Sequence, residues 1–77
     1  MTLTVEAKRR EDQPVEEVAM CFDDDGLITL IDKLQRLRGK RDHSHLMTPS
    51  WAGSELTEEK QGGAEYELVN HLRLVKL

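Results

Sequence analysis

One stretch of helical periodicity constrains this chain most. Between residues 27 and 37, leucine and isoleucine recur three and four positions apart, which places them in one apolar stripe along a helix. Asp23 is a favoured N-cap residue before this stretch, and Gly39 suits the left-handed position that ends a helix. We expect the centre of the stripe to be almost fully buried against a sheet. The stripe comprises Leu27, Leu30, Ile31, Leu34 and Leu37, and its centre is Leu30, Ile31 and Leu34.

The segments on both sides of this helix have the pattern of strands. Residues 2–8 and 17–22 alternate apolar and polar side chains across a polar turn, which indicates an antiparallel hairpin. Residues 42–48 predict a third strand that Pro49 ends, and residues 66–77 predict a fourth. The expected fold class is therefore α+β, with one helix packed on a small four-stranded, mostly antiparallel sheet in the order β-β-α-β-β. A chain of 77 residues predicts a single domain, 1–77.

The last predicted strand carries apolar side chains on both faces. Leu72 and Leu74 share one face, whereas Val75 and Leu77 lie on the other. A single helix covers only one face of a small sheet, so either the strand is bulged or its second face meets a partner. An edge strand at the carboxy terminus also offers unpaired backbone groups to a second chain. We therefore expect a homodimer through the C-terminal strand.

Charge and composition argue against several classes of function. The chain has 15 acidic and 11 basic residues, and a net charge of −4 does not favour binding to nucleic acid phosphates. It is compatible with a basic protein partner. No segment approaches the ~20 apolar residues of a membrane span, and the amino terminus lacks the pattern of a signal peptide. We expect a cytoplasmic protein that binds neither nucleic acid nor membrane.

Three histidines are the main candidates for chemistry. His43 and His45 are two residues apart on a predicted strand, so their imidazoles point the same way, and His71 on another strand can join them. Such a group can bind zinc, with Cys21 as a remote fourth ligand. Alternatively, the histidines lie on a polar sheet face and bond to neighbours or solvent. We expect no metal, no cofactor and no enzymatic activity; the competing hypothesis is a small His-based metal-binding or catalytic domain.

The irregular segment from residue 49 to residue 64 is the main candidate for a binding surface. A loop of this length in a small domain is either functional or disordered. Trp51 predicts either an exposed anchor for a partner or a side chain that folds back over the core. The carboxylates near it would form an acidic rim, and the acidic start of the helix is either a cap or a second contact surface. The candidate partner-binding residues are Trp51, Glu55, Glu58, Glu59, Asp23 and Asp24.

Several short motifs between residues 22 and 77 carry a family resemblance. The most telling is the segment His43-Ser44-His45-Leu46-Met47, which leads to Trp51. Together these motifs resemble the immunity protein 32 family, small antidotes encoded beside bacterial polymorphic toxins. The resemblance implies neutralisation of a cognate toxin by direct binding in the cytoplasm, and it assigns no toxin-contacting residues. The other matching motifs are Phe22-Asp23, Gly26-Leu27, Gly53, Glu55-Leu56-Thr57 and Asn70-His71-Leu72-Arg73.

Overall fold

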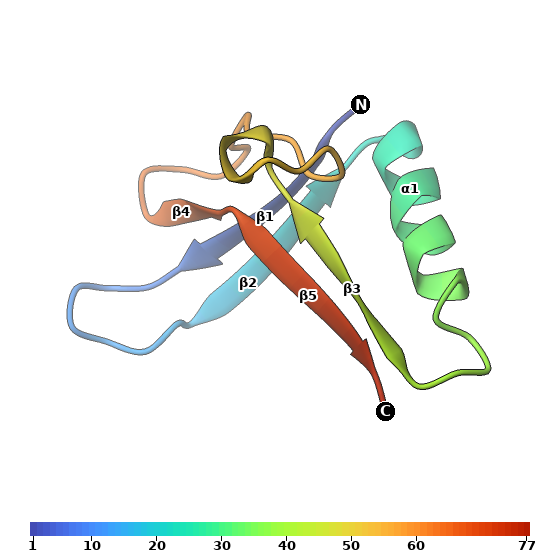
Figure 1. The fold of residues 1–77 in the computed structure, drawn as a ribbon. Helices are drawn as coiled ribbons and strands as arrows, with labels where there is room; N and C mark the ends of the chain where they lie inside the picture. Colours follow the sequence, from blue (N-terminus) through green and yellow to red (C-terminus); the bar gives the residue numbers. More distant parts are fainter.

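The chain forms five strands, one α-helix and one short 3₁₀ turn, in a computed structural model that describes residues 1–77 (Figure 1). The α+β class is confirmed, and all strand pairs are antiparallel. The single four-stranded sheet is wrong, because the strands form a three-stranded sheet, β2-β1-β4, and a two-stranded sheet, β3-β5. The elements are β1 (Leu3–Lys8), β2 (Glu17–Phe22), α1 (Asp24–Gln35), β3 (Asp42–Met47), η1 (Pro49–Trp51), β4 (Tyr66–Val69) and β5 (His71–Lys76).

The predicted last strand is divided at Asn70, and this division creates the second sheet. Val69 pairs with Val5 in β1, whereas His71 pairs with Met47 in β3. The Thr48 backbone N–H donates to the Asn70 carbonyl at 3.0 Å, and the Thr48 hydroxyl donates to Asn70 Oδ1 at 2.7 Å. Because Thr48 holds Asn70 twice, the chain leaves one sheet and enters the other at this residue.

The core lies between the two sheets, whose strands cross in Figure 1. β1 is the central strand of the larger sheet, and its Leu3 and Val5 are buried against Leu46 of β3 and Leu56 of the long loop. The loop therefore supplies a core residue. The partly buried side chains packed around this cluster are Met20, Val69, Leu72 and Leu74.

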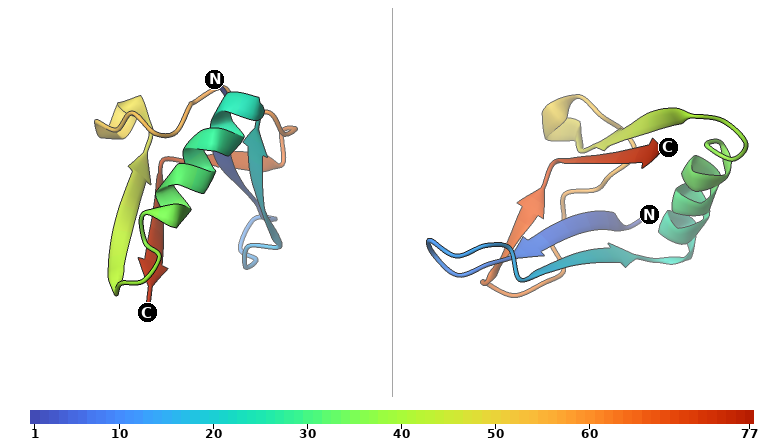
Figure 2. Two further views of the ribbon diagram at one scale, coloured as in Figure 1. Left: turned by 90° about the vertical axis from the view of Figure 1, so that its right-hand side faces the viewer. Right: turned by 90° about the horizontal axis from the view of Figure 1, so that it is seen from below.

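The prediction that the centre of the helical stripe is buried is wrong. Ile31 is 44% exposed, Leu34 is 49% exposed and Leu30 is half-buried. The core is already buried by packing of the two sheets and Leu56 against one another, without the helix. α1 therefore lies along one side of the sheets and contacts chiefly β2 (Figure 2). Only Gly26 within the helix and Leu37 just after it are buried. Most of the apolar stripe therefore faces solvent.

The helix ends follow the sequence closely. Asp23 is the N-cap, with its Oδ1 accepting from the Gly26 N–H at 2.8 Å. Asp32 and Arg36, one helical turn apart, form an ion pair at 2.9 Å. The α-helix ends at Gln35, and hydrogen-bonded turns continue to Gly39, which has the predicted left-handed conformation with φ of 78°. Local sequence therefore defines where this helix begins and stops.

We predict that Gly26→Ala destabilises the protein although alanine is the better helix former by about 1 kcal/mol. A Cβ at Gly26 would collide with the Thr2 carbonyl, which accepts from the Asp23 N–H at 3.2 Å. Overpacking of this kind costs about 1–3 kcal/mol. Thermal unfolding of Gly26→Ala should show a melting temperature several degrees lower. Gln35→Ala, at an exposed helical position, is the control and should leave the melting temperature unchanged. An unchanged melting temperature for Gly26→Ala would show that the helix start can move away from the Thr2 carbonyl without cost.

Candidate functional site

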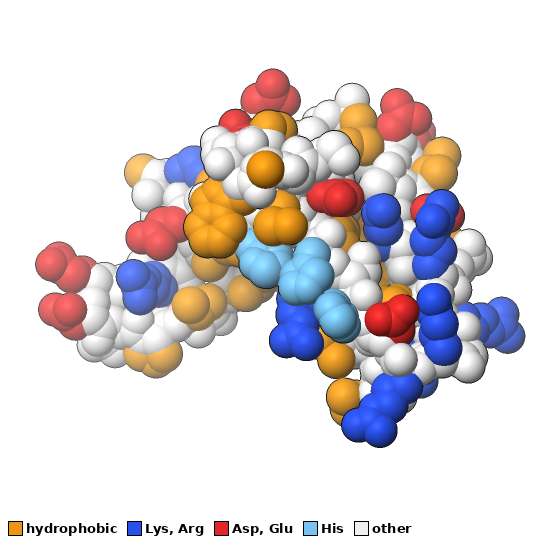
Figure 3. All heavy atoms as spheres, viewed as in Figure 1, with side chains coloured by type: hydrophobic (Ala, Val, Ile, Leu, Met, Phe, Trp, Pro, Cys, Tyr) orange, Lys and Arg blue, Asp and Glu red, His pale blue; other side chains and the backbone are white.

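The outer face of the β3-β5 sheet gathers the histidines. The register pairs His43 with Val75, His45 with Arg73 and Met47 with His71. Residues directly opposite in an antiparallel pair share a face, so these side chains lie together, opposite the buried Leu46. Figure 3 shows the three histidines as a continuous row on this surface. The shared orientation predicted for His43 and His45 is confirmed, and His71 joins them.

Two of the three imidazoles make direct contact. His45 Nδ1 and His71 Nε2 are 2.7 Å apart, so one ring nitrogen donates a hydrogen bond to the other. Partial loss of solvent lowers the pKa of His45, and positive charge on His43, His71 and Arg73 lowers it further. His43 lies at the other side of His45 with ring centroids 5.0 Å apart, and its Nδ1 is 3.8 Å from Asp42 Oδ1. The neutral form of His45 is therefore favoured.

The histidines do not converge as a metal centre. No group of three or more histidine, cysteine, aspartate or glutamate side chains is placed to hold a metal ion. Cys21, the remote candidate ligand, lies half-buried on β2 in the other sheet. Two convergent nitrogens fall short of the four ligands typical of a structural zinc site.

We predict that the fold does not depend on a metal. Protein dialysed against a strong chelator should keep its circular dichroism spectrum and its melting temperature, because the only convergent nitrogens already bond to each other. Adding zinc should not raise the melting temperature appreciably. Stoichiometric zinc that survives dialysis, and that is lost in a His43→Ala/His45→Ala protein, would contradict this prediction.

Trp51 extends the row of histidines. It ends the η1 turn, in which the Trp51 N–H donates to the Thr48 carbonyl at 2.9 Å and Ala52 adopts a left-handed conformation. The Trp51 and His71 ring centroids are 6.2 Å apart. The Trp51 side chain is 56% exposed, so it does not plug the core. We call this surface, made of Trp51, His71, His45 and His43, the Trp–His face.

The carboxylates of Glu55, Glu58 and Glu59 in the loop differ in their exposure and in their hydrogen bonds. Glu55 is half-buried and accepts from the Met47 N–H at 3.1 Å, and chiefly this bond lowers its pKa. Glu58 is exposed and accepts from the Ser50 N–H at 2.6 Å; its hydrogen bonds to Ser50 lower its pKa. Glu59 is exposed and its carboxylate makes no hydrogen bond. Glu58 and Glu59 therefore present charge to solvent, while Glu55 mainly holds the loop.

The acidic start of the helix is a cap. Both carboxylate oxygens of Asp23 are used, because Oδ1 accepts from Gly26 and Oδ2 accepts from the Thr2 N–H at 2.9 Å. The hydrogen bond from Gly26, and then that from Thr2, lowers the pKa of Asp23. Asp24 is exposed in the first helical turn. Of this pair, only Asp24 is free to meet another molecule.

One structurally important carboxylate was missed by sequence reasoning. The alternation of residues 2–8 predicts that Glu6 lies on the polar face of the first strand, yet it is fully buried. Its carboxylate accepts from the Thr4 hydroxyl at 2.6 Å, from the Gln61 N–H at 2.9 Å and from the Gly62 N–H at 2.7 Å. Burial raises the pKa of Glu6, but these hydrogen bonds outweigh it and leave the pKa below its ordinary value. Glu6 therefore fastens the far end of the long loop to β1.

Comparison with known proteins identifies no relative: no family model, no curated protein and no solved structure matches this chain. The helix is not long and apolar enough to cross a membrane. The site is an exposed row of aromatic rings on the two-stranded β3-β5 sheet and the η1 turn, next to a loop that β1 holds in place. Such a surface is suited to contact with another macromolecule.

Proposed function

We propose that this chain is an immunity protein that binds a cognate bacterial toxin in the cytoplasm and blocks the active site of the toxin or the approach of its substrate. The observation that carries this proposal is the exposure of Trp51 at the end of the Trp–His face. Interfaces concentrate their binding energy in a few aromatic or arginine anchors. An exposed tryptophan that a tight turn holds in place loses little conformational freedom on binding.

The acidic loop after Trp51 and the net charge of the chain favour a basic protein as the partner. Glu58 and Glu59 are exposed in the loop that follows Trp51, and the whole chain carries a net charge of −4. Opposite potentials on two proteins accelerate their encounter and orient them. The same acidity disfavours nucleic acid, whose phosphates require surplus lysine and arginine.

The family resemblance falls on the same surface. The segment from His43 to Trp51 carries the most telling motif, and it supplies three of the four residues of the Trp–His face. His71, the fourth, lies in another matching motif. The resemblance supports a toxin as the partner, and the geometry supports this face as the contact surface.

The proposal is tested by co-expressing this protein with the candidate toxin, the product of the gene that lies beside its own. Cells that produce the toxin alone should stop growing, whereas cells that also produce this protein should grow, and the two proteins should co-purify in a fixed ratio. An unrelated toxin is the specificity control and should not be neutralised. Continued growth arrest with both proteins folded and abundant would refute the proposal.

The second candidate is a small metal-binding or catalytic domain that uses His43, His45 and His71. The observation that favours it is the 2.7 Å approach of His45 and His71. Elemental analysis of the purified protein separates the two hypotheses. Stoichiometric zinc, copper or nickel together with failure to neutralise the toxin would favour the metal-binding domain.

A further inference from the structure

The outward face of α1 leaves an unusually large apolar surface uncovered. Ile28 is 65% exposed, and Leu27, Ile31 and Leu34 are also exposed. The accessible surface of the chain is 5505 Å² for a mass of 8.8 kDa. A monomer of this mass typically exposes about 4,800 Å². The excess of roughly 700 Å² is close to the ~800 Å² that each partner buries in a standard interface.

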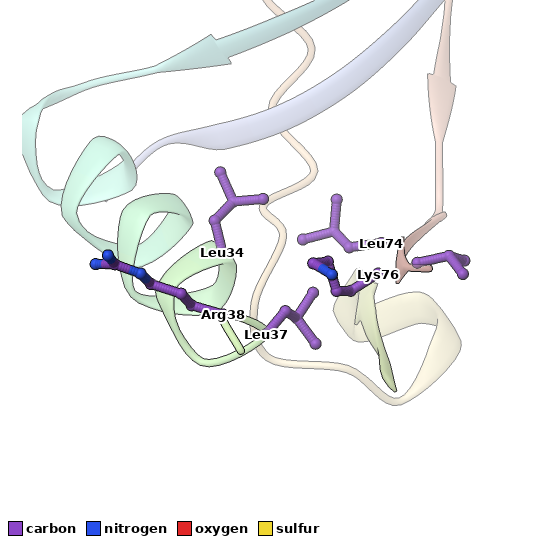
Figure 4. Close-up of a pocket in the computed structure, with 6 residues that line it drawn as sticks. Leu34, Leu37, Arg38, Leu74 and Lys76 are labelled. Carbon is purple, nitrogen blue, oxygen red and sulfur yellow. The ribbon is translucent and has the colours of Figure 1, made fainter. Parts of the chain in front are cut away.

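An apolar groove adjoins this face. It has a volume of about 280 Å³ and separates the end of the helix from β5 (Figure 4). Leu34 and Leu37 form one wall, and Leu74 and Val75 form the other. Arg38 and Lys76 complete the lining with their long side chains. The groove can therefore receive an apolar side chain from a molecule that lies along α1.

The exposed face is centred on Ile31, and successive residues of a helix turn by about 100°. Leu27 and Leu34 therefore lie on one side of Ile31, and Ile28 and Gln35 lie on the other. Asp24 and Arg38, seven residues before and after Ile31, lie close to the middle of the face. Along the helix the face thus runs from an acidic residue through apolar residues to a basic one.

An antiparallel copy of the same helix matches this order. A two-fold axis between the two Ile31 side chains keeps each residue on its own side of the contact line, so Leu27 of the second copy lies beside Leu34, next to the groove. The same axis places Asp24 of one copy opposite Arg38 of the other. Arg38 lies in the turn that follows the α-helix, and its backbone N–H donates to the Gln35 carbonyl at 3.1 Å. Arg38 therefore stays close to the path of the helix. Apolar contacts thus lie at the centre and opposite charges at both ends.

We propose that this protein forms a two-fold symmetric homodimer through antiparallel packing of its α1 helices, with the two Ile31 side chains at the axis and Leu27 of each copy beside the groove of the other. A symmetric interface must be self-complementary, and the order acidic, apolar, basic along the helix meets this requirement only in the antiparallel arrangement. The contact surface differs from the C-terminal strand edge expected from sequence. It also shares no residue with the Trp–His face, so dimer formation and toxin binding are tested separately.

Sedimentation equilibrium of the purified protein over a range of concentrations tests the dimer. The wild type should approach twice its 8.8 kDa mass. Ile28→Glu should remain monomeric and keep its circular dichroism spectrum, since Ile28 is largely exposed in the single chain. Val18→Glu, at an exposed position on β2, is the matched control and should dimerise like the wild type. A monomeric wild type, or a dimer that Ile28→Glu leaves intact, would overturn the proposal.

A charge swap tests the antiparallel register. Asp24→Lys and Arg38→Glu should each raise the dimer dissociation constant by roughly 2–30-fold, because each pair occurs twice in a symmetric dimer and an exposed ion pair contributes about 0.2–1 kcal/mol. The double variant Asp24→Lys/Arg38→Glu should recover most of the affinity. If the double variant is weaker than either single variant, the helices do not pack in this register.

Discussion

Glu6→Ala is expected to destabilise the protein by about 2–5 kcal/mol, because it removes the acceptor of three buried or partly buried hydrogen bonds. The N–H groups of Gln61 and Gly62 would lose their partner, and the long loop would detach from β1. In a domain of this size a loss of 1 kcal/mol lowers the melting temperature by about 4–8 °C. Thermal unfolding should therefore show a melting temperature lower by at least about 8 °C, and urea unfolding an equivalent shift of the midpoint.

The matched control is Glu67→Ala, which removes an exposed carboxylate from the neighbouring strand β4. That substitution should change the free energy of unfolding by less than about 0.5 kcal/mol. Equal stability of the two variants would mean that water replaces Glu6 as the partner of the loop.

Glu6 also makes stability depend on acid in a defined direction. Its folded pKa lies below the ordinary value of 4.5, so its stabilising contribution is complete above pH 4.5 and is lost as the pH falls through the folded pKa. Asp23, Asp42, Glu55 and Glu58 also have lowered pKa values and add to the acid sensitivity. The difference in stability between wild type and Glu6→Gln isolates Glu6, and it should narrow as the pH falls below 4.5.

Trp51→Ala is expected to weaken toxin binding by at least about 2 kcal/mol, which corresponds to roughly 30-fold faster dissociation. The fold should be preserved, since the side chain is more than half exposed and the η1 turn is held by backbone hydrogen bonds. Surface plasmon resonance with the toxin gives the dissociation rate, and thermal unfolding reports the fold.

Phe22→Ala provides the aromatic control for this experiment. Phe22 is also exposed, but it ends β2 in the other sheet and lies outside the Trp–His face. Its removal should leave toxin dissociation unchanged. If Trp51→Ala binds normally, the contact surface lies elsewhere, and the exposed Asp24 at the helix start is the next residue to replace.

The elements that sequence predicted well depend on local interactions. The first hairpin, the Asp23 cap and the left-handed Gly39 after the helix each follow from residues close together in the chain. The division of the last strand depends instead on contacts between Thr48 and Asn70, 22 residues apart. Alternation of apolar and polar residues carries no signal for a contact of that kind.

The periodicity of a helix or strand likewise does not determine whether a given face is buried or exposed. The helical spacing shows that Leu27, Ile31 and Leu34 share one stripe, but the position of the helix beside the sheets decides whether that stripe is buried. Glu6 is the opposite case, a polar residue that is buried. The alternation of apolar and polar residues along a strand is the same whether its polar face meets solvent or is covered by a distant loop. Its partners Gln61 and Gly62 lie 55 and 56 residues away.

The candidate site was predicted in part for the same reason. The spacing of His43 and His45 indicated a shared orientation, and the structure shows both on one face. The closest imidazole contact, however, joins His45 to His71 across the β3-β5 pair and depends on the register of these strands. Whether Trp51 is exposed depends on how the η1 turn is placed, which no local pattern determines.

The most direct test of toxin neutralisation is a titration of the purified toxin's activity with this protein. We predict that activity falls linearly to baseline at a fixed stoichiometric ratio of the two proteins. Trp51→Ala should require a large excess to reach the same inhibition, whereas Phe22→Ala should behave like the wild type. Full toxin activity in the presence of a large excess of folded wild-type protein would contradict the proposed function.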